Sequence, residues 1–192
     1  RMRNAAKGER NKSSGKSASM RKGYHVQKRR ARVPCMHYPI AILLHNIRSA
    51  HNVGAIFRTA DAAGVTKIFL SGYTPTPIDR FKRPQKEIAK TALGAETYIP
   101  WEYAKTAAPV IRKMRAEGYA VVGIEQDARA KDYRTSSLSV PTLFIFGNEV
   151  RGISHTLRKE CDRLLFIPMH GKKESLNVAT TAGIILFSVH ST

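Results

Sequence analysis

Cysteine and long apolar runs are scarce in this chain of 192 residues. Only two cysteines are present, Cys35 and Cys161. They are too few for a disulfide framework or a cysteine zinc site, which is typical of a reducing compartment. No apolar run approaches the roughly 20 residues of a membrane helix, and no apolar stretch marks a secretory signal. We therefore expect a cytoplasmic protein without a membrane segment.

Acidic residues are also few, and their shortage leaves a large positive charge. The chain has 33 Lys and Arg against 14 Asp and Glu, a formal net charge of +19. Solubility requires far less, so a polyanionic partner is favoured, nucleic acid first. Residues 1–36 hold 12 of the basic residues and a single acid, a net charge of +11.

Those first 36 residues are rich in Ser, Gly, Asn, Lys and Arg and show no apolar period. Such a segment cannot bury enough surface to offset the entropy of ordering, so we expect a disordered basic arm that contacts RNA. The alternatives for these residues are a targeting segment and the remnant of an expression tag. Residues 37–192 suffice for one compact domain.

From about residue 39, short apolar runs alternate with amphipathic segments, as in βα units on a mostly parallel sheet flanked by helices. This α/β pattern predicts strands at 40–44, 67–71, 97–99, 120–124, 142–146 and 164–167. It predicts helices at 52–63, 85–93, 109–117 and 175–190. We expect Asn52 to cap the first of these helices and Ser175 the last.

Several common catalytic motifs are missing. No G-x-G-x-x-G follows the first strand, and neither G-x-S-x-G nor H-E-x-x-H occurs. The segment Gly15-Lys16-Ser17 lacks the earlier glycine of a phosphate loop. No cluster of metal ligands is recognisable, so no metal is expected. The histidines near polar segments (His45, His51 and His170) are more often packing or surface residues than catalytic bases.

Three segments instead carry polar residues that a plain βα domain does not need. The first, residues 46–64, contains Asn52 and Arg58, and the second ends an apolar strand in Gly147-Asn148-Glu149. The third joins Ile167-Pro168-Met169 to Ser175-Leu176-Asn177. Alone, each has a structural explanation: a solvated arginine, a polar turn and a helix cap. Together they favour one active site at the carboxyl ends of the strands.

These segments resemble motifs 1, 2 and 3 of the SpoU family, the TrmH-like RNA ribose 2′-O-methyltransferases of the SPOUT superfamily. The matching patterns are Asn-x5-Arg, Phe-Gly-Asn-Glu-x2-Gly and Ile-Pro-Met-x5-Ser-Leu-Asn-Val, in the family's order over about residues 40–190. The resemblance implies a deep trefoil knot at the carboxyl end of the fold, which ordinary connection rules do not anticipate. It also implies S-adenosylmethionine bound in the knot, and an obligate homodimer with active sites at its interface.

The same resemblance implies roles for individual residues. Arg58 would activate the ribose 2′-hydroxyl, and Asn52 would shape motif 1. Glu149, Ser175 and Asn177 would complete the site. Main-chain groups near four residues would hold the adenosine part of the cofactor: Gly147, Ile167, Met169 and Leu176.

The implied substrate is transfer or ribosomal RNA, and the sequence does not distinguish them. Arginine is a poor base because its pKa exceeds about 12, so Arg58 is expected to stabilise a developing alkoxide or to recruit an RNA phosphate. One departure from the family pattern is Ala179, which stands where a serine is usual. Four basic residues offer a track for the RNA backbone: Arg80, Lys82, Arg83 and Lys86.

Two other functions stay open at this stage. An RNA-binding assembly factor could keep the knotted fold without turnover, although it would have no use for the polar residues of the three motifs. An adenosine-nucleotide binder of the parallel-sheet type is opposed by the missing phosphate loop.

Overall fold

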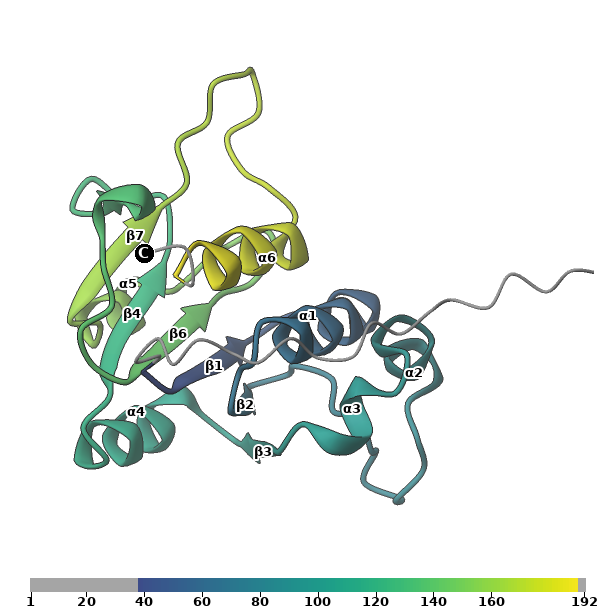
Figure 1. Cartoon of the computed structure of the whole chain (residues 1–192). Helices are drawn as coiled ribbons and strands as arrows, with labels where there is room; N and C mark the ends of the chain where they lie inside the picture. Colours follow the sequence, from purple (N-terminus) through teal and green to yellow (C-terminus); the bar gives the residue numbers. More distant parts are fainter. Residues whose placement is uncertain (1–37, 190–192) are drawn as a thin grey trace, which may run out of the picture. The chain divides into compact units, whose positions relative to one another are not determined.

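A parallel sheet of seven strands forms the centre of the structure, a computed structural model that describes residues 38–189 (Figure 1). The predicted basic arm and His190 lie outside these residues. The strand order is β3-β2-β1-β6-β4-β7-β5. The strands are β1 (Ile40–His45), β2 (Lys67–Ser71), β3 (Trp101–Ala104), β4 (Ala120–Ile124), β5 (Lys131–Asp132), β6 (Thr142–Phe146) and β7 (Arg163–Phe166).

The two central strands explain why the sheet needs cover on both faces. Every residue of β6 is buried, and so is every residue of β1 before its last. Their register pairs Ile40 with Thr142 and Leu44 with Phe146. Continuous apolar runs of this kind are typical of parallel strands that are covered on both sides. The predicted mostly parallel α/β fold is confirmed.

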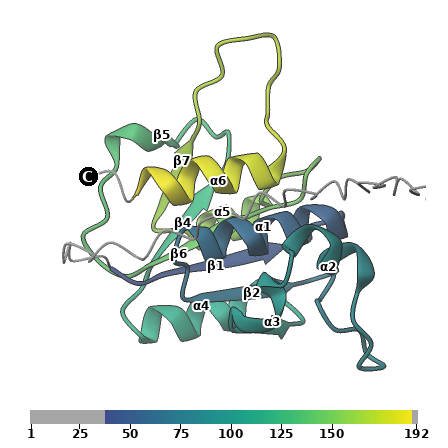
Figure 2. The ribbon, with the colours of Figure 1, turned by 45° about the vertical axis from the view of Figure 1, so that its right-hand side comes forward.

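Helices cover the two faces of the sheet unequally (Figures 1 and 2). One core cluster joins the sheet to α1, α2, α3 and α6, and the other joins it to α4 and α5. The helices are α1 (Ala50–Ala62), α2 (Lys86–Ala92), α3 (Ala95–Tyr98), α4 (Ala107–Ala116), α5 (His155–Lys159) and α6 (Val178–Ser188), with a 3-10 turn, η1 (Tyr133–Thr135). None of these helices is long and apolar enough to cross a membrane.

Most predicted elements are confirmed within one to three residues, but the strand predicted at 97–99 is wrong. Residues 95–98 form α3, and the strand begins at Trp101. Gly94 has a φ of 98°, which allows the chain to turn from α2 directly into α3. The carbonyl of Pro100 then accepts a hydrogen bond from the amide of Ile68, and the ladder with β2 starts there. The trefoil knot stays a prediction.

Candidate active site

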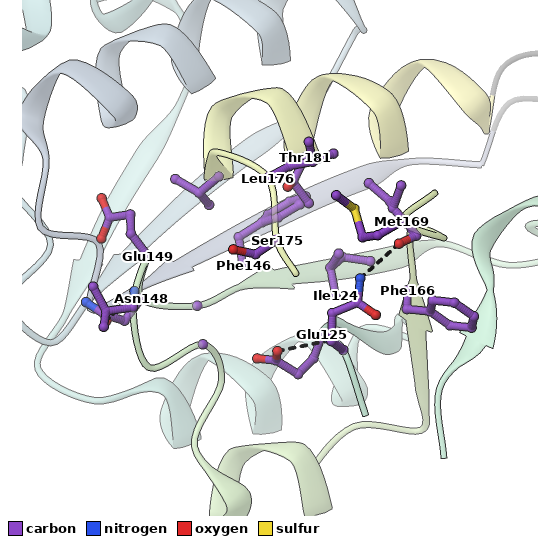
Figure 3. Close-up of a pocket in the computed structure, with 16 residues that line it drawn as sticks. Ile124, Glu125, Phe146, Asn148, Glu149, Phe166, Met169, Ser175, Leu176 and Thr181 are labelled. Atoms are coloured by element: carbon purple, nitrogen blue, oxygen red, sulfur yellow. Dashed lines mark hydrogen bonds between the residues drawn. The ribbon is translucent and has the colours of Figure 1, made fainter. Parts of the chain in front are cut away.

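A pocket of about 150 Å³ opens at the carboxyl ends of β4, β6 and β7, beside the start of α6 (Figure 3). Ligand sites of parallel α/β sheets lie at this edge, because the connecting loops diverge there. The lining residues come from all three neighbouring strand ends and from the segment before α6: Ile124, Glu125, Gln126, Phe146, Gly147, Asn148, Glu149, Val150, Gly152, Phe166, Ile167, Met169, Ser175, Leu176, Val178 and Thr181.

The loop after β6 folds back on itself and supplies one wall of this pocket. The amide of Asn148 bonds the carbonyl of Gly152 at 3.1 Å, and the reverse bond measures 2.8 Å. A side chain on Gly147 would overlap the backbone of Gly152, and Gly152 itself has a φ of 62°. The loop therefore requires both glycines. Gly147 was predicted to lie where main-chain groups hold the cofactor, and the shape of the loop is a second reason for a glycine there.

Asn148 holds the same loop from within. Its side chain is 7% exposed, and its Oδ1 accepts the amides of Val150 (3.0 Å) and Arg151 (2.8 Å). Its Nδ2 donates to the carbonyl of Asn46 at 3.0 Å and to the Tyr73 hydroxyl at 3.1 Å. The sequence interpretation did not assign Asn148 a role, although the residue lies within the second motif.

Glu149 connects the second motif to the first. Its carboxylate accepts the main-chain amides of Arg48 (2.9 Å) and Ser49 (3.1 Å) and the Nδ2 of Asn52 (2.9 Å). Burial alone would raise the pKa of Glu149, but the hydrogen bonds from Arg48 and Asn52 outweigh it and hold the pKa below the ordinary 4.5. Glu149 is thus an ionised acceptor at the amino end of α1, where a negative charge is favoured.

Asn52 continues the connection to the third motif. Its Oδ1 accepts a hydrogen bond of 3.1 Å from the Nδ2 of Asn177. Glu149, Asn52 and Asn177 therefore form one chain of hydrogen bonds, although they lie up to 125 residues apart in the sequence. The structure brings together one predicted catalytic residue from each of the three segments.

Both predicted helix caps are wrong. The cap of α1 is Ser49, whose Oγ accepts the amide of Asn52 at 3.3 Å, so Asn52 lies inside the first turn. The cap of α6 is Asn177, whose Oδ1 accepts the amide of Ala179 at 2.8 Å. A capping side chain must reach the second or third amide of the helix, and Ser175 precedes that position by two residues.

Ser175 instead lines the pocket, as Met169 and Leu176 do (Figure 3). All four residues that were predicted to bind the cofactor line it: Gly147, Ile167, Met169 and Leu176. The Ile167 carbonyl accepts the Gln126 Nε2 at 2.9 Å, which ties the β7 end to the β4 end. Within residues 38–189, the main-chain groups of Met169 and Leu176 form no hydrogen bond with the protein. They are available to a ligand.

Arg58 is the predicted site residue that does not join the others. Its side chain is exposed on α1 and lines a separate shallow groove with Lys90 and Leu93, not the pocket. It makes no hydrogen bond or ion pair with any other described residue. The pocket of a single chain therefore contains no arginine from α1.

The sequence interpretation missed Glu125 and Gln126, which follow directly after β4 and line the pocket. Glu125 lines the pocket, and its carboxylate accepts the amides of Ile153 (2.6 Å) and Gln126 (3.0 Å). Their place after a buried strand of a parallel sheet is the signal that could have found them.

His45 forms a hydrogen bond with Ser71 at 2.8 Å, and burial lowers the pKa of His45, as expected of a packing residue. Over the described range, no group of three or more His, Cys, Asp or Glu could hold a metal ion.

Comparison with known proteins gives a consistent result. The model of the SpoU rRNA Methylase family matches residues 39–187. The 23S rRNA (guanosine-2′-O-)-methyltransferase RlmB of Pseudomonas syringae pv. tomato is 34% identical over 149 residues, which make up 78% of this chain and 57% of that protein.

Solved structures resemble the chain over a similar range. The AdoMet-bound rRNA methyltransferase from Sinorhizobium meliloti is 36% identical, with a TM-score of 0.72 over 80% of this chain and 56% of that one. The SpoU methyltransferase AviRb from Streptomyces viridochromogenes, in complex with AdoMet, is 27% identical, with a TM-score of 0.70 over 82% of this chain and 59% of that one. The chain spans a little more than half the length of these relatives.

Proposed function

The chain belongs to the SpoU rRNA methylase family, and from that premise we propose that it transfers a methyl group from S-adenosylmethionine to a ribose 2′-hydroxyl of ribosomal or transfer RNA. The observation that carries this proposal is the hydrogen-bonded chain of Glu149, Asn52 and Asn177 beside the pocket. The inactive assembly factor is the alternative that the experiment below tests.

The pocket fits the cofactor by its chemistry. Adenine has polar edges that main-chain groups can bind and flat faces that aliphatic side chains can cover. The lining offers both, since Met169 and Leu176 have unbonded main-chain groups and Ile167 and Leu176 are aliphatic. When bound, S-adenosylmethionine supplies an electrophilic methyl carbon on its sulfonium. We assign its adenosine part to Gly147, Ile167, Met169 and Leu176.

The protein's own residues then orient the ribose. Glu149 accepts three hydrogen bonds and has a lowered pKa, so its role is to hold Asn52 and the start of α1 rather than to remove a proton. Ser175 has no hydrogen-bond partner among the described residues, and its hydroxyl is available to the substrate. Alignment of this kind can supply a large part of a rate enhancement, on the order of 7 kcal/mol or more.

Arg58 requires a second subunit in this proposal. Because its side chain lies outside the pocket of its own chain, we propose a homodimer in which Arg58 of one protomer serves the pocket of its partner. Its guanidinium would stabilise the developing alkoxide or hold the RNA phosphate that takes the proton, since arginine does not lose its own. The cytoplasmic location expected from the sequence is part of the same proposal.

The deciding experiment uses S-adenosylmethionine labelled on its methyl group and total RNA of the host, separated into ribosomal and transfer fractions. We expect label on a ribose 2′-oxygen in one fraction. Arg58→Ala should abolish the transfer and leave cofactor affinity unchanged, while Arg112→Ala, an exposed arginine on α4, serves as the control. Cofactor binding without transfer to any RNA would contradict the proposed activity and favour the assembly factor.

A further inference from the structure

The loop between β2 and α2 ends in a small hairpin that is fixed by one carboxylate. Ile78 and Pro84 form an antiparallel bridge that closes the tip. The Oδ1 of Asp79 accepts the amides of Phe81 (2.8 Å) and Arg83 (2.9 Å), and its Oδ2 accepts the Nε of Arg83 (2.9 Å). The hydrogen bonds from Arg83 hold the pKa of Asp79 below its ordinary value. The tip is therefore preformed at neutral pH.

This hairpin displays an aromatic ring and positive charge to the solvent. Phe81 is 61% exposed. The guanidinium carbons of Arg80 and Arg83 lie 4.7 and 4.9 Å from the centre of its ring, within the range of cation–π attraction. Asp79 forms an ion pair with Arg83 (2.9 Å), whereas Arg80 and Lys82 have no acidic partner among the described residues. The exposed surface thus combines an aromatic ring with the positive charge of Arg80 and Lys82.

The loop is attached to the candidate active site at its start and to α1 through α2 at its end. At its start, the Tyr73 hydroxyl accepts a hydrogen bond of 3.1 Å from Asn148, and the Tyr73 amide donates to the Asn46 side chain at 3.3 Å. At its end, α2 packs on α1, where the Thr91 hydroxyl donates to the His51 carbonyl at 3.0 Å. The loop projects beyond the sheet below α2 (Figure 2). The hairpin is thus held at a fixed offset from the pocket.

We propose that residues 78–84 are a preformed docking site for an unpaired nucleotide of the RNA substrate. A base stacks on Phe81 in the place of the Arg80 guanidinium, which then contacts a flanking phosphate, while Arg83 stays paired with Asp79 and supports the ring. Aromatic rings bind single-stranded bases in this way without regard to sequence, and arginine forks match phosphate oxygens. A duplex hides the faces of its bases, so the site selects RNA that is open near the modified ribose. The inference rests on RNA being the substrate, as in the proposed function.

The test compares Phe81→Ala with Phe81→Trp in the full chain. The probes are a short single-stranded RNA oligonucleotide and a blunt duplex of the same sequence, with affinity followed by fluorescence anisotropy. Phe81→Ala should weaken single-strand binding by roughly 5- to 100-fold and leave duplex binding unchanged, while Phe81→Trp binds like the parent. Tyr98→Ala, which removes an aromatic side chain of similar exposure (60%) on α3, is the matched control.

Equal single-strand affinity of Phe81→Ala and the parent would overturn the inference, and so would an equal loss on the duplex. Arg80→Ala should lower the slope of log affinity against log salt by about 0.7, the value for one phosphate contact on a single strand. Methyl transfer by the parent chain is measured separately. If the parent chain methylates RNA but Phe81→Ala does not change the affinity for single-stranded RNA, only the docking site is refuted. If Phe81→Ala weakens that affinity but the parent chain does not methylate RNA, only the proposed reaction is refuted.

Discussion

Asn177 has two roles that different replacements can distinguish: it caps α6, and it bonds Asn52 in the active site. Asn177→Ala removes the cap of α6 and the hydrogen bond to Asn52. Loss of a cap costs about 0.5–2 kcal/mol, and loss of an ordinary hydrogen bond about 0.5–1.5 kcal/mol. We therefore expect a fall of about 1–3.5 kcal/mol in the free energy of unfolding.

Asn177→Asp keeps the capping oxygen and loses only the donor to Asn52. Its carboxylate lies at the amino end of α6, which is favourable by about 0.3–1 kcal/mol, so stability should stay close to that of the parent. Methyl transfer should nevertheless fall, because the new carboxylate faces the Oδ1 of Asn52 and breaks the chain of hydrogen bonds to Glu149. Asn177→Ala should therefore be less stable than Asn177→Asp, whereas both variants should lose methyl transfer.

Urea denaturation of the full chain measures the stability, and labelled-methyl transfer measures the activity. Thr180→Ala is the control, since Thr180 is exposed in the same turn and its hydroxyl has no partner among the described residues. Full activity in Asn177→Asp would refute the role of the Asn52–Asn177 bond in the site. An Asn177→Ala variant as stable as the parent would refute the cap as a source of stability.

Two further predictions concern Glu149 and Arg58. The folded-state pKa of Glu149 lies below 4.5, so its contribution to the free energy of unfolding is complete above that pH and is lost as the pH falls through the folded-state pKa. Glu149→Gln should therefore reduce the fall of the free energy of unfolding with falling pH, measured by denaturation at a series of pH values. An unchanged pH dependence would contradict this role of Glu149. Arg58→Ala and Leu176→Arg, each inactive alone, should regain about a quarter of the parent activity after mixing and subunit exchange, because half of the dimers are mixed and each has one intact site. No recovery would mean that Arg58 acts within its own chain.

The sheet could be predicted from the sequence because its strands are continuous apolar runs between polar turns. The run at 142–146 is fully buried and matches β6 without a shift. The region after α2 was less predictable, because Thr97-Tyr98-Ile99 is rich in residues that favour strands, yet a left-handed Gly94 starts a helix there. Local preference is overridden when the turn before a segment fixes its direction.

The candidate site was predictable in its location but not in its bonding. Parallel strands end at one edge, so the three polar segments had to converge there. Which asparagine caps α6 depends on where the chain enters the helix after the loop at 167–177, and sequence spacing does not determine that. The position of Arg58 outside the pocket was equally hidden, because helical spacing from Asn52 does not fix which neighbour the other face of α1 meets.

The state of the two carboxylates bears most directly on the reaction. Among the described residues that line the pocket, Glu125 and Glu149 are the ionisable ones. Glu125 accepts two main-chain amides, and Glu149 accepts two amides and the Asn52 side chain. Each is bonded into the wall of the pocket, and the lowered pKa of Glu149 makes that carboxylate a poor proton acceptor. In the proposed reaction, the proton of the ribose hydroxyl passes to a group that the RNA, the solvent or a second subunit brings, and the pocket's own contribution is alignment.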